Sequence, residues 1–81
     1  MTKILRLRLY QGLRQIDFAE KCSLGQSTIQ SIERGNRTRV VSAKLVANAL
    51  AMPINELFMT GIDPRYLYPI KSFDIGDSDD N

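Results

Sequence analysis

Two short amphipathic segments with a tight break between them constrain the fold of this chain more than any other feature. Residues 15–22 place their apolar side chains on one side of a two-turn helix and their charged side chains on the other. Residues 26–34 place Ile29 and Ile32 three apart among polar residues, and a glycine follows. Because the break at residues 23–25 is so short, the sequence predicts two helices joined by a tight turn.

A helix is also predicted ahead of this pair, over residues 3–11. Thr2 is a suitable N-cap, and Gly12 can end the helix in a left-handed conformation. Taken alone, the alternation of leucine and arginine over residues 5–9 would suit a strand. We prefer the helix because the segments that follow it are helical.

Two more helices are expected after the pair. A polar, basic loop at residues 36–39 leads into an Ala/Val/Leu-rich helix over residues 40–51, and Pro53 can start a last short helix that runs to about Met59. Residues 66–70 are apolar without a helical period. The sequence therefore predicts an all-α fold of five helices with a short irregular C-terminal extension.

The 81 residues suffice for one compact domain, which we place at residues 1–61, with residues 62–81 as an extension that is a candidate for the dimer interface, together with the last helix. Cys22 is the only cysteine and histidine is absent, so the chain lacks the residues for a disulfide framework or a Cys/His zinc site. No cofactor is expected. Because no long uninterrupted apolar stretch occurs, we expect a cytoplasmic protein.

Charge is segregated along the chain. Residues 1–60 hold nine Lys/Arg and four Asp/Glu, a net charge of +5, whereas residues 61–81 hold two and five, a net charge of −3. A basic body favours a polyanionic partner, and we expect the acidic end to be disordered.

Residues 15–35, QIDFAEKCSLGQSTIQSIERG, resemble the helix-turn-helix of the Cro and phage-repressor family, also called Xre-type. The positions that seal the two helices of such a unit hold apolar or small residues, which here are Phe18, Ala19, Cys22, Leu24, Ile29 and Ile32. The likeness covers roughly the first 58 residues, and includes Ala47-Asn48-Ala49-Leu50 and Ile54-Asn55-Glu56-Leu57-Phe58. It implies a lambda-repressor-like DNA-binding domain.

The turn departs from the family pattern at two residues. Ser23 stands where the family usually has glycine, and Gly25 stands where a serine or threonine often caps the recognition helix. Either the turn is re-formed or Ser23 takes a left-handed conformation.

The resemblance assigns the residues that would contact DNA. The face of the recognition helix that enters the major groove would read bases with Gln26, Ser27, Thr28, Gln30 and Ser31. Gln15 would contact a phosphate and brace that helix. The phosphate contacts after the helix would come from Arg34, Arg37 and Arg39, with Arg14 and Thr38 as weaker candidates.

The same resemblance assigns a structural role to two further residues. Arg8 and Glu33 would form an ion pair between the first helix and the end of the recognition helix. Cys22 is expected to pack between helices rather than react.

The favoured function is a sequence-specific DNA-binding transcriptional regulator, and of the two kinds of regulator we favour a repressor. We expect it to bind its double-stranded operator as a homodimer. The alternative is a protein-interaction module, such as an antitoxin or a helix-turn-helix that no longer binds DNA. An enzyme is disfavoured because the sequence lacks a nucleophile, acid-base or phosphate-loop motif. No small-molecule or membrane partner is indicated.

Overall fold

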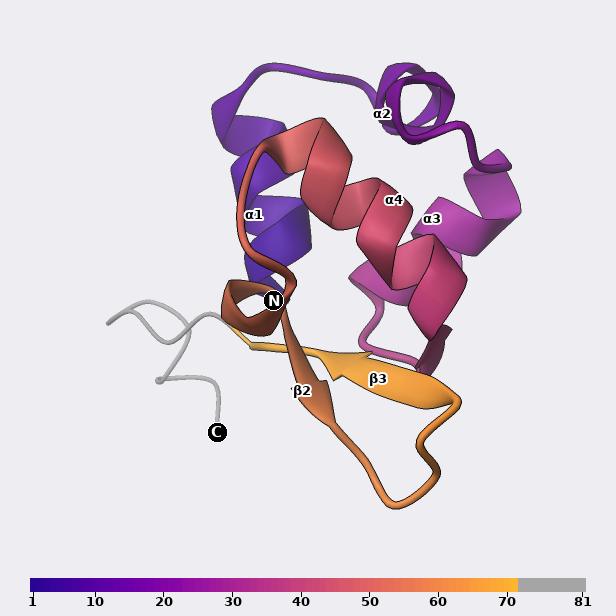
Figure 1. Ribbon diagram of the computed structural model, residues 1–81. Helices are drawn as coiled ribbons and strands as arrows, with labels where there is room; N and C mark the ends of the chain where they lie inside the picture. Colours follow the sequence, from indigo (N-terminus) through magenta and orange to yellow (C-terminus); the bar gives the residue numbers. More distant parts are fainter. Residues whose placement is uncertain (72–81) are drawn as a thin grey trace.

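The computed structural model describes residues 1–71 of the chain, and within them four α-helices surround one apolar core (Figure 1). The elements in chain order are α1 (Lys3–Tyr10), α2 (Gln15–Cys22), α3 (Gln26–Glu33), β1 (Thr38–Arg39), α4 (Val40–Leu50), the 3-10 helix η1 (Ile54–Glu56), β2 (Phe58–Thr60) and β3 (Tyr66–Pro69). The helices gather on one side of the β2–β3 hairpin in Figure 1. None of the described helices is long and apolar enough to cross a membrane.

Each of the four α-helices is followed within two residues by a residue with positive φ. These residues are Gly12, Ser23, Gly35 and Ala51, with φ of 73°, 59°, 92° and 54°. After α2, the Ser23 and Leu24 amides donate to the Glu20 and Ala19 carbonyls, which satisfies two carbonyls that the helix leaves unpaired. Ser23, which stands at the family's glycine position, therefore takes the left-handed conformation. The helix predicted over residues 3–11 is confirmed as α1, with Thr2 as its N-cap.

The core joins the apolar faces of all four helices. Its largest fully buried side chains include Phe18, Ile4, Ile29 and Leu57. Cys22 belongs to this cluster as a free thiol, and burial raises its pKa to about 11. The thiol therefore stays protonated and unreactive at neutral pH, as a packing residue would.

A three-stranded antiparallel sheet closes the domain, in the order β1-β3-β2. Its central strand, β3, places Tyr66 opposite Arg39 and Tyr68 opposite Met59. Beyond β3 the chain returns to the N-terminus, where the Lys3 amide donates to the Ile70 carbonyl at 2.9 Å.

The expectation of an all-α, five-helix fold with an irregular extension is wrong. The helix predicted from Pro53 to Met59 stops after the single 3-10 turn of η1, and Phe58 already belongs to β2. The apolar segment at residues 66–70 contains β3 rather than irregular chain. Strands of two to four residues are too short to show a clear alternation of apolar and polar side chains, and β1 meets its partner β3 only after α4 and β2 have intervened. The acidic end after residue 71 lies outside the described residues.

Replacing the two non-glycine helix ends with glycine should stabilise the protein. For Ser23→Gly and Ala51→Gly we expect the free energy of unfolding to rise by up to about 1 kcal/mol each, because glycine adopts positive φ without steric cost. Gly12→Ala is the opposite control: a Cβ there meets no heavy atom within 4 Å, so its loss of stability reports the backbone alone. Urea unfolding measures all three, and unchanged or lower stability for both glycine variants would contradict the assignment.

Candidate nucleic-acid interface

The helix-turn-helix unit is formed by α2, the turn at Ser23 and α3. The turn packs the two helices against each other through Phe18, Ala19 and Cys22 on one side and Ile29 and Ile32 on the other, all of them buried. With these faces sealed, the polar face of α3 is left outside. Ser27 and Gln30 are exposed, while Thr28 and Ser31 are half-buried.

A buried ion pair anchors the end of α3. The Arg8 guanidinium donates twice to the Glu33 carboxylate, at 2.6 Å from Nε to Oε2 and 3.0 Å from Nη2 to Oε1. Their side chains are only 11% and 4% exposed, so water screens the pair little. A third nitrogen of Arg8 donates to the Leu13 carbonyl at 2.8 Å, which ties the α1–α2 loop to the same group.

The hydrogen bonds continue from this pair to the start of α3. Gln15 Nε2 donates to Glu33 Oε1 at 3.1 Å, and Gln26 Nε2 donates to Gln15 Oε1 at 3.3 Å. Gln26 keeps one N–H and its carbonyl oxygen for another partner, which are the groups that a two-bond contact with adenine requires. Gln15 is thus placed to hold Gln26 in one orientation.

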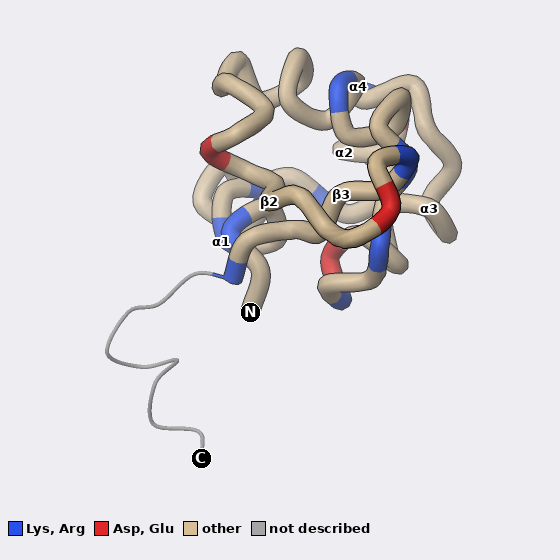
Figure 2. Tube along the Cα trace, turned by 60° about the horizontal axis from the view of Figure 1, so that its bottom comes forward, with Lys and Arg blue, Asp and Glu red and all other residues tan. Residues whose placement is uncertain are grey.

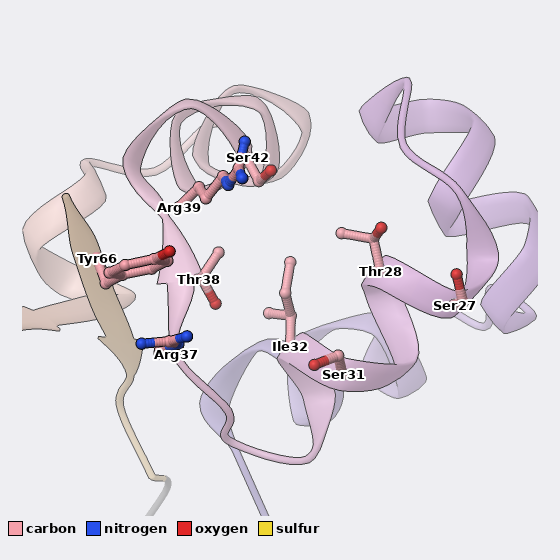
Figure 3. Close-up of a pocket in the computed structure, with 9 residues that line it drawn as sticks. All are labelled: Ser27, Thr28, Ser31, Ile32, Arg37, Thr38, Arg39, Ser42 and Tyr66. Carbon is pink, nitrogen blue, oxygen red and sulfur yellow. The ribbon is translucent and has the colours of Figure 1, made fainter.

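The polar face of α3 and the segment after it border one hollow of about 390 Å³. Figure 3 shows Thr28, Ser31 and Ile32 on the α3 side and Arg37, Thr38, Arg39 and Tyr66 on the opposite side. Ser27 and Ser42 complete the lining. Hydroxyl and guanidinium groups dominate it, and no carboxylate is among the lining residues. Such a hollow suits an anion.

The arginines after α3 keep their charges available. The described residues hold eleven Lys/Arg and five Asp/Glu, and Figure 2 shows several basic positions near α3 and β3. Three of the five acids already pair with other arginines: Glu33 with Arg8, Asp17 with Arg14 and Asp63 with Arg65. Among residues 1–71, no hydrogen bond or ion pair engages the side chains of Arg34, Arg37 or Arg39, all of which are exposed.

The side chains of the two weaker phosphate candidates, Arg14 and Thr38, already form hydrogen bonds within the protein. Arg14 donates to both oxygens of Asp17, at 2.8 and 3.0 Å, and its hydrogen bond holds the pKa of the Asp17 carboxyl below its usual range. Thr38 is buried, and its hydroxyl donates to the Asn36 carbonyl at 3.2 Å. Both residues would have to give up these partners to contact DNA.

The structure adds two residues that the sequence analysis did not single out, Ser42 and Tyr66. Ser42 lies in the first turn of α4. The only sequence signal for its place at the hollow was its position three residues after Arg39. Tyr66 reaches the hollow because β3 pairs with β1, and no local sequence pattern predicts this pairing. Within residues 1–71, no group of three or more His, Cys, Asp or Glu side chains could hold a metal ion.

Comparison with known proteins gives one match. The sequence model of a family described as helix-turn-helix matches residues 4–57, which include α1 apart from its first residue, α2 to α4 and η1. Searches of curated proteins and of solved structures returned no match. The matched segment ends before β2, so the C-terminal hairpin lies outside it.

Removing the Glu33 carboxylate should destabilise the protein strongly. Glu33→Ala leaves the Arg8 guanidinium buried without its partner, and we expect the free energy of unfolding to fall by about 3–5 kcal/mol. Asp17→Ala is the matched control because it breaks an exposed arginine–carboxylate pair, whose loss should shift the urea midpoint far less. Equal shifts for the two variants would show that the buried pair contributes no more than an exposed one.

Proposed function

Since this chain belongs to the Xre/Cro-type helix-turn-helix family of DNA-binding regulators, we propose that it is a sequence-specific transcriptional repressor. It acts in the cytoplasm by occupying a double-stranded operator, with α3 in the major groove. The observation that carries this proposal is the set of three exposed arginines after α3, whose side chains form no ion pair with a carboxylate within residues 1–71. Two of them, Arg37 and Arg39, border a hollow lined by hydroxyls.

Base reading is assigned to the polar face of α3. Gln26 starts the helix with its amide already oriented by Gln15, so less freedom is lost when it meets a base. Ser27 and Gln30 are exposed beside it, and Thr28 and Ser31 face the hollow. Ser31 also accepts a hydrogen bond from Asn36 at 3.1 Å, which leaves its hydroxyl proton for a base or a phosphate.

Phosphate contacts are assigned to Arg34, Arg37 and Arg39, with Gln15 as a further one. These contacts position the protein and set its affinity but carry no sequence information. The alternative function, a protein-interaction module such as an antitoxin, would need neither an oriented Gln26 nor a carboxylate-free hollow.

We further propose that the protein binds DNA as a homodimer, because one α3 reads only half of a two-fold-symmetric site. β2 is an edge strand whose residues, Phe58, Met59 and Thr60, carry no charge. Such a strand can pair antiparallel with its own copy across a two-fold axis. Met59 and Tyr68 border an apolar hollow beside this edge, and are 54% and 41% exposed.

Variants of Gln26 and Arg39 can distinguish the contacts with bases from the contacts with phosphates. Gln26→Ala should cost about 1–3 kcal/mol per half-site on the operator and little on random DNA. Arg39→Ala should weaken both DNAs alike and reduce the slope of log affinity against log salt by about one unit. The operator is first selected from a random pool, and both variants are then titrated on both DNAs across a salt series.

Two outcomes would count against the proposal. Absence of any DNA binding by the unmodified protein favours the protein-interaction module. Equal losses for Gln26→Ala on operator and random DNA remove its role as a reader.

Met59→Lys tests the dimer. A charge on the β2 edge should shift sedimentation toward monomer and weaken binding to a full operator more than to an isolated half-site. Val41→Lys is the control for sedimentation, because Val41 is an exposed apolar residue (70%) at the start of α4, where it borders Arg39 and Tyr66 rather than β2. If both variants sediment like the unmodified protein, the β2 edge is not the interface.

A further inference from the structure

We propose that Tyr66 of β3, outside the matched segment, belongs to the DNA interface as a positioning residue that holds Arg37 against a backbone phosphate. The inference rests on the proposed function. It gives the C-terminal hairpin a part in binding that the helix-turn-helix alone does not supply.

The contact is a stacked one. The Arg37 Cζ lies 4.3 Å from the centroid of the Tyr66 ring, and in Figure 3 the guanidinium lies against the ring while the tyrosine hydroxyl points toward α3. The ring is itself held in place. Tyr66 pairs with Arg39 between β3 and β1, and its amide donates to the Asp63 carbonyl at 3.1 Å.

Stacking leaves the useful edges of the guanidinium free. It engages the face of the group, whereas the N–H donors that match a phosphate lie in its plane. Within residues 1–71, no hydrogen bond or ion pair uses these donors. Tyr66 therefore restricts a long, flexible side chain without occupying its donors, which lowers the entropy lost on binding.

A competing role for Arg37 is neutralisation of Asp63. The pKa of the Asp63 carboxyl is held below its usual range, first by hydrogen bonds from Arg65 and only weakly by the charge of Arg37. Arg65 donates to both oxygens, at 2.7 Å from Nη2 to Oδ2, and Asp63 also accepts from the Arg65 amide at 2.9 Å. Asp63 is thus satisfied without Arg37. The stacked arginine faces a hollow that contains hydroxyls and a second arginine, and the chemistry that fits there is a phosphate of the DNA backbone.

A double-mutant cycle on DNA tests the pairing of Tyr66 with Arg37. Valine suits a strand, so Tyr66→Val removes the ring with little effect on β3, and urea unfolding checks that the variant is folded. We expect Tyr66→Val to weaken operator and random DNA several-fold, Arg37→Ala to reduce the salt slope by about one unit, and the double variant to bind no worse than Arg37→Ala. Tyr66→Phe, which keeps the ring, should retain the salt slope.

Arg34 provides the matched control, because it is an exposed arginine of the same segment and does not border the hollow. Losses from Tyr66→Val and Arg34→Ala should add, whereas those from Tyr66→Val and Arg37→Ala should not. Additive losses in both cycles, or an unchanged affinity for Tyr66→Val beside a loss for Arg37→Ala, would overturn the inference and leave the proposed function standing. No DNA binding by the unmodified protein would remove the proposed function instead.

A measurement on the unmodified protein covers the case in which Tyr66→Val does not fold. The NMR order parameter of the Arg37 Nε–Hε bond should exceed that of Arg34 in the free protein, because only Arg37 is stacked. Equal, low order parameters for the two arginines would overturn the inference.

Discussion

The carboxylate of Glu33 is the acceptor on which three helices depend. It lies at the end of α3, receives two hydrogen bonds from Arg8 of α1 and receives a third from Gln15 at the start of α2. A buried carboxylate is costly unless its lone pairs are satisfied, and here donors from two other elements satisfy them. The same group that fixes the helix packing also orients Gln26, through Gln15. Under the proposed function, one side chain therefore couples stability to base reading.

A second junction forms at Thr2. Its hydroxyl accepts from the Leu5 amide, which caps α1, and donates to the Glu33 carbonyl at 3.1 Å, which ties α1 to the end of α3. Thr2 also bridges to Lys71 at the far end of the described chain. The N-terminus therefore connects α3 to the segment that follows β3. Through this junction the C-terminal hairpin is part of the folded domain.

Local patterns were sufficient for most of the helix-turn-helix. Thr2 as a cap and the apolar spacing of Phe18, Cys22 and Ile29 follow from interactions within a few residues, and the structure has both. The sequence left the turn open between two geometries, and the structure has the one with a left-handed Ser23. The segment from Pro53 to Met59 was misread because its apolar residues suit a helical turn as well as a strand. Its C-terminal part pairs with β3 instead, since Met59 lies opposite Tyr68.

The sequence by itself determined α2, α3, α4, the tight turn between α2 and α3 and the polar face of α3, because each depends on caps and periodicities that span one or two turns. For α1 the alternating pattern alone suited a strand, and the helical segments after it decided the prediction. Only the tertiary structure decided the sheet and its contact with the segment that follows α3. A two-residue strand such as β1 has no stability of its own and exists because β3 supplies its hydrogen bonds. That pairing places Tyr66 against Arg37, two residues that are far apart in the sequence and meet only when the chain has closed.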